Sequence, residues 1–239
     1  MRKWYIGTSG WFYEHWRGRF YPTQLTQRDW LSYYAQFFST VEINVTFYRL
    51  PYKGIITGWI KKTPPDFRFV IKGSRKITHF NKLKNITQPL EALISRVNLM
   101  REKVLCILWQ LPPALTCDLV LLKEFISQLP STFRHTFEFR HPSWLQDNTF
   151  NLLEHYKMAH CSMSAPKLPC NLTTTTDFAY IRFHGIQGWY NYNYTEEDLL
   201  WWKDRLHVIA DKVTTVLVYF NNDHEAYAVK NALRLKEIV

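Results

Sequence analysis

The sequence predicts an α/β protein of the (β/α)8 TIM-barrel type. Eight short apolar segments recur along the 239 residues, and helical patterns lie between most of them. Strands that alternate with helices form parallel sheets, and eight such units are the number that closes a barrel. An open, doubly wound sheet is the alternative. No interdomain linker or internal repeat interrupts the pattern, so we expect one domain over residues 1–239.

The second observation is the alternation of side chains at the carboxyl ends of the expected strands. In five of them one parity is apolar and the other is polar, as in Val41-Glu42-Ile43-Asn44 and Ile181-Arg182-Phe183-His184. Successive side chains of a strand point to opposite faces, so a polar interior and an apolar outer face under helices suit a closed barrel. The expected strands span 4–9, 40–45, 67–73, 104–110, 135–140, 160–164, 178–184 and 214–221.

Each expected helix starts at a residue that commonly caps helices. The clearest start is Thr195 followed three residues later by Asp198, which is a capping box ahead of an apolar run. Residues 165–177 contain two prolines and four consecutive threonines, so we expect no regular helix after the sixth strand. The expected helices run over about 26–38, 87–102, 118–128, from 195 onward, and 223–235.

The composition favours anionic partners. The chain has 30 Lys and Arg against 20 Asp and Glu, a net charge of +10, and an aromatic content of 17%. Such a charge favours nucleic acid, phosphorylated metabolites or acidic lipid, although it can also serve solubility alone. Walker, GxGxxG and GxSxG motifs are missing from the sequence, which disfavours P-loop hydrolysis, dinucleotide redox chemistry and serine esterase activity.

The cysteines and the amino terminus favour a cytoplasmic protein. The four cysteines show no CxxC pairing, so we expect free thiols in a reducing compartment. Met1-Arg2-Lys3 runs directly into the first strand, so we expect no signal peptide. No apolar run approaches the ~20 residues of a membrane span, and we therefore expect no membrane association. Nothing indicates an obligate protein partner.

The polar strand ends define the candidate site, because active sites of barrel enzymes lie at this end. Three cations outnumber two carboxylates, which favours an anionic, phosphate-bearing ligand. Glu42 or Glu138 could serve as general base or acid with His184 as partner, so these three are the candidate catalytic residues. The alternative is a salt-bridge network that only plugs the barrel. The inward polar set is Glu42, Asn44, Lys72, Gln110, Glu138, Arg140, Arg182, His184 and Asn221.

A divalent metal is a further alternative, because Glu42, Glu138, His184 and Asp223 all follow strand ends. Cations interleaved with these ligands would repel a metal, and no HExxH-like spacing supports one. We therefore predict no metal ligands, and no cofactor is clearly indicated.

Aromatic and basic loops follow several strands and reach the same rim. Aromatic faces beside cations can stack on nucleobases or pack on sugar rings. A basic stretch also follows the third strand, which is suited to a phosphate backbone. Non-catalytic binding of single-stranded nucleic acid is therefore the competing function, and a scaffold protein is a third. The candidate ligand-binding residues are Ser9, Trp11, Asn44, Tyr48, Lys72, Arg75, Gln110, Arg140, Arg182, Trp189, Tyr190 and Asn221.

A set of ordered motifs resembles the YecE-like family, known as domain of unknown function 72 (DUF72). It covers nearly the whole chain and includes Gly7-Thr8-Ser9-Gly10-Trp11, Phe137-Glu138-Phe139-Arg140-His141-Pro142 and Tyr219-Phe220-Asn221-Asn222-Asp223. The resemblance implies a (β/α)8 barrel and no established reaction. Many members of the family carry an Asp near the end of the sixth strand, where this sequence reads Cys161-Ser162-Met163-Ser164-Ala165-Pro166.

Overall fold

Eight parallel strands form the centre of the protein, whose computed structural model describes residues 2–239. They are joined in the order β1-β8-β7-β6-β5-β4-β3-β2, so consecutive strands from β2 to β8 pair with each other, and β1 pairs with β8. The strands are β1 (Lys3–Thr8), β2 (Thr40–Ile43), β3 (Arg68–Lys72), β4 (Val104–Gln110), β5 (His135–Glu138), β6 (Ala159–Ser164), β7 (Phe178–Phe183) and β8 (Thr215–Phe220). The predicted α/β TIM-type barrel is confirmed, with all eight strands within about two residues of their expected bounds.

The barrel closes between β1 and β2 without a full ladder of hydrogen bonds. A single bridge joins Ser9 to Glu42. Lower in this seam, the Tyr34 hydroxyl accepts a hydrogen bond from the Thr8 amide at 3.0 Å and donates one to the Thr40 carbonyl at 3.1 Å. A tyrosine therefore satisfies backbone groups that a regular ladder would otherwise pair.

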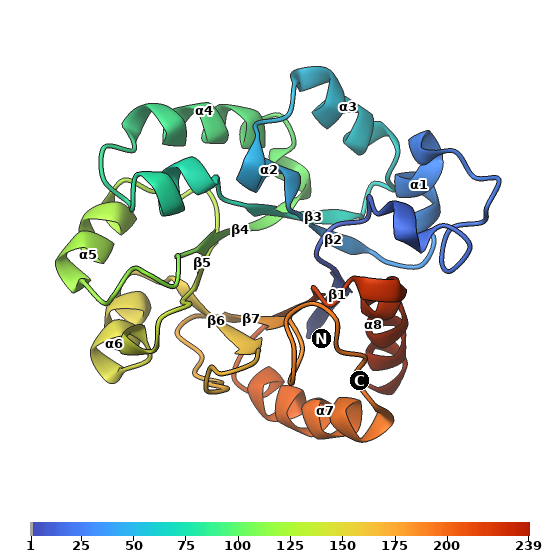
Figure 1. The fold of residues 1–239 in the computed structure, drawn as a ribbon. Helices are drawn as coiled ribbons and strands as arrows, with labels where there is room; N and C mark the ends of the chain where they lie inside the picture. The colour runs from blue at the N-terminus through green and yellow to red at the C-terminus, as the bar shows by residue number, and fades with distance from the viewer. Residues whose placement is uncertain (1) are drawn as a thin grey trace.

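Helices surround the strands, as the view along the barrel axis shows (Figure 1). No helix lies between β6 and β7, as predicted. Three helices, α2, α3 and α6, were not predicted. The helix expected over 26–38 is shorter, because residues 27–29 form a separate 3-10 turn. The α-helices are α1 (Trp30–Tyr34), α2 (Val45–Tyr48), α3 (Lys53–Lys61), α4 (Thr87–Asn98), α5 (Leu119–Ser127), α6 (Asp147–His155), α7 (Glu196–Ala210) and α8 (Tyr227–Ile238).

The capping box at the start of α7 is confirmed. The Thr195 side chain accepts from the Asp198 amide at 3.2 Å, and the Asp198 carboxylate accepts from the Thr195 amide at 2.9 Å. This box satisfies two polar groups at the first turn, so the long β7–α7 loop is anchored where it meets its helix.

Two apolar cores flank the barrel wall. The larger lies between the strands and the helices, and it includes Trp109, Phe137 and Phe183. The smaller fills the barrel interior with residues of the opposite parity, among them Leu108 and Tyr180. The predicted alternation therefore holds, but the lower barrel interior is apolar and only the strand ends are charged.

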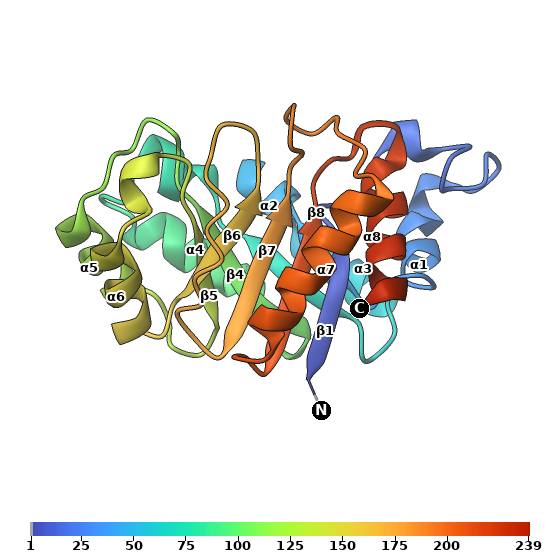
Figure 2. The ribbon, with the colours of Figure 1, turned by 90° about the horizontal axis from the view of Figure 1, so that it is seen from below.

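All eight strands point toward the same edge, where long loops rise above the sheet (Figure 2). This edge is the mouth of the barrel, and it contains the polar strand ends. Within residues 2–239, no helix combines the length and the apolar character that crossing a bilayer requires.

Candidate functional site at the barrel mouth

Arg182 on β7 lies at the centre of a buried ion cluster. Its Nη2 donates to Glu42 Oε1 at 2.6 Å, and its Nη1 donates to Glu138 Oε2 at 2.5 Å. Nη2 also reaches the Ser9 hydroxyl at 3.3 Å. The side chains of Arg182, Glu42 and Glu138 are 0% exposed. The planar guanidinium can bond two carboxylates at once, which links β7 to β2 and β5 across the interior.

Arg140 completes the pairing of Glu138 and also contacts His184. Its Nε donates to Glu138 Oε1, and its Nη2 lies 3.0 Å from His184 Nε2, which Arg182 Nη1 approaches at 3.4 Å. Both guanidiniums present donors to Nε2. On the other side of the ring, the side-chain nitrogen Nδ2 of Asn221 lies 3.1 Å from His184 Nδ1.

These contacts set the charge states of the cluster. Burial lowers the pKa of His184, and the nearby Arg140 and Arg182 lower it further, so the imidazole stays neutral. Burial alone would raise the pKa of Glu138, but Arg140 and Arg182 outweigh it and hold that pKa well below its usual range. The carboxylate is therefore ionised, and both its oxygens have cationic partners.

The second carboxylate is satisfied as well. Tyr180, from the apolar interior below, donates its hydroxyl to Glu42 Oε2 at 2.5 Å, while Arg182 occupies Oε1. Burial and the Glu42 charge raise the pKa of Tyr180 well above its usual range, so it remains a donor. Two carboxylates are thus matched by two guanidiniums, and the buried cluster carries no excess charge.

Lys72, at the end of β3, is a buried cation of the mouth that lies outside the paired cluster. Its side chain is buried, with 9% of the residue exposed, and its Nζ lies 4.3 Å from the centre of the Phe47 ring. Among residues 2–239 no carboxylate oxygen lies within 4.0 Å of this amine. Burial, reinforced by the charge of Arg182, lowers the pKa of Lys72 to about 7.

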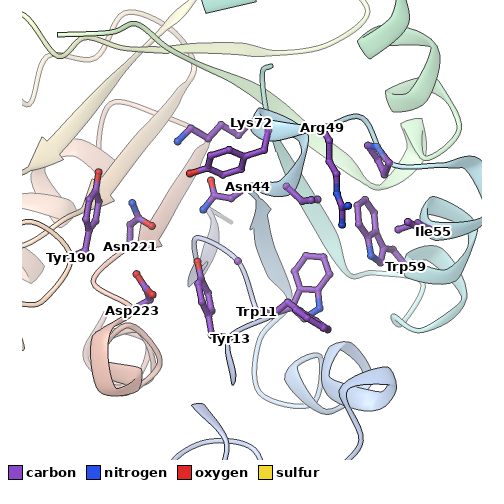
Figure 3. A pocket seen from close by; sticks show the side chains of 15 residues that line it. Trp11, Tyr13, Asn44, Arg49, Ile55, Trp59, Lys72, Tyr190, Asn221 and Asp223 are labelled. Atoms are coloured by element: carbon purple, nitrogen blue, oxygen red, sulfur yellow. The ribbon is translucent and has the colours of Figure 1, made fainter. Parts of the chain in front are cut away.

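Lys72 lines a pocket of about 670 Å³ that opens beside the ion cluster (Figure 3). Its amine is directed toward the side of the pocket where Tyr190 and Asn221 lie, and Arg49 and Trp59 line the opposite side. The remaining labelled lining residues are Trp11, Tyr13, Asn44, Ile55 and Asp223. The walls are thus mostly aromatic and amide side chains, with the cations Arg49 and Lys72 and one carboxylate, Asp223.

Asn44 places an unused acceptor in this wall. Its Nδ2 donates to the Ser9 carbonyl at 2.9 Å, which orients the amide. Its Oδ1 is buried and has no hydrogen-bond partner within residues 2–239. The register pairs Ile43 of β2 with Ile71 of β3, so Asn44 and Lys72 follow side by side at the same level. Adjacent strand ends therefore carry an amine without a carboxylate partner and a buried acceptor without a donor.

The structure divides the residues predicted for the site into three groups. Trp11, Asn44, Tyr48, Lys72, Tyr190 and Asn221 line the pocket. Ser9, Glu42, Glu138, Arg140, Arg182 and His184 form the buried cluster. Arg75, Trp189 and Gln110 lie at the edges: Arg75 stacks beside Tyr48, Trp189 lies over Arg140, and Gln110 is the partner of Glu138 in the β4–β5 register.

Several pocket residues were not predicted. Ile55 and Trp59 come from α3, whose two glycines make a weak helical pattern, although their spacing of four places them on one face. Arg49 follows α2 directly and could have been found from its place in the loop after the second strand. Tyr180 was missed although it shares the parity of Arg182.

An exposed cation–aromatic stack extends from the pocket residue Tyr48 along the same rim. The Arg75 guanidinium lies 5.2 Å from the Tyr48 ring and 5.3 Å from the Phe80 ring, and these rings are 62% and 68% exposed. Arg75 precedes the π-helical turn Lys76–Phe80, a form found often at functional sites.

The mouth offers no ready metal site. Glu42, Glu138 and His184 face arginines, and Asp223 lies apart from them beside His15, with 3.6 Å between its Oδ2 and His15 Nε2. No group of three or more His, Cys, Asp and Glu suited to a metal occurs within residues 2–239. At the end of β6, Ser164 accepts a hydrogen bond from the Tyr194 hydroxyl at 2.7 Å.

The fold and the mouth together define a (β/α)8-barrel protein with a polar pocket at the carboxyl ends of its strands. The profile of the family described as "Protein of unknown function DUF72" matches residues 5–239, and the chain belongs to this family.

Curated relatives and solved structures agree with this assignment. The UPF0759 protein YunF of Bacillus subtilis (strain 168) is 25% identical over 98% of this chain and 94% of its own length. The UPF0759 protein YecE of Escherichia coli (strain K12) is 30% identical over 59% of this chain and 49% of its own. A DUF72 family protein from Thermotoga maritima MSB8 superposes with a TM-score of 0.90 at 30% identity, covering 98% of both chains. A DUF72 family protein from Enterococcus faecalis V583 shares the fold, with a TM-score of 0.86 at 20% identity over 98% of this chain and 94% of its own.

Proposed function

We propose that the barrel mouth binds a small anionic ligand, phosphate-bearing or carboxylate-bearing, and that Lys72 is its principal anion-binding group. The observation that carries this proposal is the missing carboxylate partner of Lys72. A buried amine without a counter-charge is costly, because burial disfavours the ammonium form. An anion in the pocket would supply that partner.

The rest of the wall indicates what else the ligand carries. Trp11 and Trp59 meet edge to face, with 5.6 Å between their ring centres, and form an apolar wall suited to a ring or a hydrocarbon body. The free Oδ1 of Asn44 suits a hydroxyl or amino donor on the ligand. A sugar phosphate or a hydroxylated organic acid has this combination of groups.

Glu42, Glu138 and His184, the candidates for proton transfer, fit a supporting role better within this proposal. Glu138 and Glu42 use both their oxygens on protein donors, and His184 uses both ring nitrogens. We assign these residues to holding Arg140 and Asn221 in place at the pocket edge. If the protein is an enzyme, Lys72 is the group with an available lone pair.

Calorimetric titration with inorganic phosphate and sugar phosphates tests the proposal. We expect Lys72→Met to reduce affinity at least tenfold at pH 6, and the matched change of an exposed lysine, Lys84→Met, to leave it unchanged. The affinity of the unaltered protein should fall as the pH rises through about 7, because Lys72 loses its charge there. Equal affinities in the two variants would exclude Lys72 as the anion-binding group.

A second candidate function, binding of single-stranded nucleic acid, is favoured by the stack of Arg75 between Tyr48 and Phe80. Exposed aromatic faces beside a cation can stack on bases, at about 1–3 kcal/mol per base. Lys82 and Lys84, both exposed, extend the positive charge from this stack along the outer rim.

Fluorescence anisotropy with a labelled single-stranded oligonucleotide tests the second candidate. Tyr48→Ala and Phe80→Ala should each weaken binding by about 1–3 kcal/mol, and affinity should fall steeply with added salt. Tyr52, 80% exposed but not stacked on Arg75, provides the control in Tyr52→Ala. An affinity that does not change with salt would rule this function out.

A further inference from the structure

We infer that Lys72 is an imine-forming amine and that the ligand of the pocket is a small anionic aldehyde or ketone. This inference rests on the proposed function, because it takes the anion-binding pocket as the site of the reaction. It goes beyond that function by giving Lys72 a covalent role and by naming the carbonyl group as the feature that is recognised.

The position of the amine supports this role. An amine that serves only to stabilise the fold is expected to have a carboxylate partner, as the two buried guanidiniums do. Lys72 has none within residues 2–239, and it lines a cavity large enough for a small metabolite. Its stem is held by the barrel wall, so the amine is presented to the cavity from a rigid strand end.

The charged groups around Lys72 favour a neutral amine. Burial lowers its pKa most, Arg182 from β7 and Arg140 beyond β5 lower it further, and Glu138 and Glu42 oppose them. The carboxylates are already engaged by the guanidiniums, and the Phe47 ring adds only a weak preference for the charged form. His79, from the π-helical turn, has a lowered pKa and adds no fixed charge. A desolvated lysine beside other cations is a recognised way to obtain a nucleophilic amine at neutral pH.

The step balances without an oxidant or a reductant. The Nζ lone pair adds to the carbonyl carbon, a C–N bond forms, and the π electrons of the carbonyl move to its oxygen, which takes up a proton. The resulting hydroxyl leaves as water while the nitrogen lone pair forms the C=N bond. Both hydrogens of the neutral amine leave in that water. If the imine is then protonated, its proton comes from solvent.

Two neighbours fit the needs of this step. The buried Oδ1 of Asn44, next to Lys72 in the β2–β3 register, can accept the hydrogen of the hydroxyl that forms on the former carbonyl carbon. Arg49 lines the same pocket, is exposed, and has no carboxylate within 4.0 Å among residues 2–239. Arg49 therefore gives the pocket a second cation, which can hold the anionic end of the ligand once the Lys72 amine has reacted with the carbonyl.

Reductive trapping tests the inference. The protein is incubated with pyruvate, glyoxylate or glyceraldehyde 3-phosphate and with sodium cyanoborohydride, and the intact mass and the modified peptide are determined. We expect one adduct per chain on Lys72 with at least one of these probes. The adduct should disappear in Lys72→Arg and persist in Lys84→Arg. Adducts spread over surface lysines to the same extent in all three proteins would overturn the inference.

A kinetic measurement on the unaltered protein avoids any dependence on variants. The rate of trapping at Lys72 should rise with pH and reach half its maximum near pH 7, because the neutral amine is the reactive form. The trapping rates at exposed lysines should instead continue to rise until the pH nears their ordinary pKa of 10.5. A Lys72 peptide that labels with the pH profile of the exposed lysines would contradict the inference.

The two proposals fail in distinguishable ways. Lys72→Arg retains a cation but cannot form an imine, so phosphate binding should survive in this variant while trapping is lost. Phosphate binding by the unaltered protein with no trapped carbonyl compound would reject the imine and leave the anion pocket standing. Absence of both phosphate binding and trapping would reject both.

Discussion

The ion cluster around Arg182 and the pocket around Lys72 lie at the same mouth of the barrel but satisfy their charges differently. In the cluster, every carboxylate oxygen of Glu42 and Glu138 has a donor, and the side chains are fully buried. In the pocket, within residues 2–239, the Lys72 amine has no carboxylate partner and the Asn44 side-chain oxygen has no hydrogen-bond partner.

This difference shows that charge at the carboxyl end of a barrel does not by itself identify reactive groups. Buried polar groups whose hydrogen bonds are all made join strands and orient neighbouring side chains. Their shifted pKa values keep each group in one charge state. An unsatisfied group costs stability in the free protein, and a ligand can recover that cost. Measurements of stability can therefore separate the two regions.

The largest expected effect comes from Arg182→Met. Removal of this guanidinium leaves two buried carboxylates without their shared partner, and we expect the free energy of unfolding to fall by about 5 kcal/mol. Urea unfolding followed by circular dichroism measures this change. Arg182→Lys keeps the positive charge but cannot donate to both carboxylates in the same geometry. It should therefore recover only part of the lost free energy of unfolding. A small effect of Arg182→Met on the free energy of unfolding would mean that the ion cluster does not stabilise the fold.

The second effect has the opposite sign. Lys72→Met removes a buried charge that has no counter-ion, so we expect the free energy of unfolding to rise by on the order of 3 kcal/mol below pH 7. The folded pKa of about 7 lies below the ordinary 10.5, so the unfolded state binds more protons between these values. The stability of the unaltered protein should therefore rise with pH across this window, and the advantage of the variant should shrink.

Unfolding of both proteins at pH 6, 8 and 10 checks this prediction. Lys84→Met, at an exposed position, is the matched control and should show no such pH dependence. Destabilisation by Lys72→Met at every pH would mean that Lys72 stabilises the fold, as the residues of the ion cluster do. The contrast between the two regions would then not hold.

The smallest effect is expected at the surface. Arg234 pairs with Glu196 and lies 3.0 Å from Glu237, and all three side chains are well exposed. Exposed pairs are screened by solvent and contribute little, so Arg234→Met should leave the denaturant midpoint nearly unchanged. A loss comparable to that of Arg182→Met would show that burial is not what separates strong from weak ion pairs in this protein.

Local patterns in the sequence were enough to predict much of the fold. The eight strands, the missing helix after β6 and the capping box at Thr195 were all predicted, because alternation, proline and capping residues act over a few neighbouring positions. The helices α2, α3 and α6 were missed. The α3 segment contains Gly54 and Gly58, so packing against the barrel outweighs its weak propensity.

The sequence by itself determined which side chains face the barrel interior, because parity along a strand is a local property. Only the tertiary structure decided which of these side chains are paired. Arg182 and Lys72 have the same inward parity and the same sign, yet one lies between two carboxylates and the other beside a phenyl ring and a cavity. That outcome depends on strand register, on depth in the barrel and on loops far apart in the chain, none of which a single strand encodes.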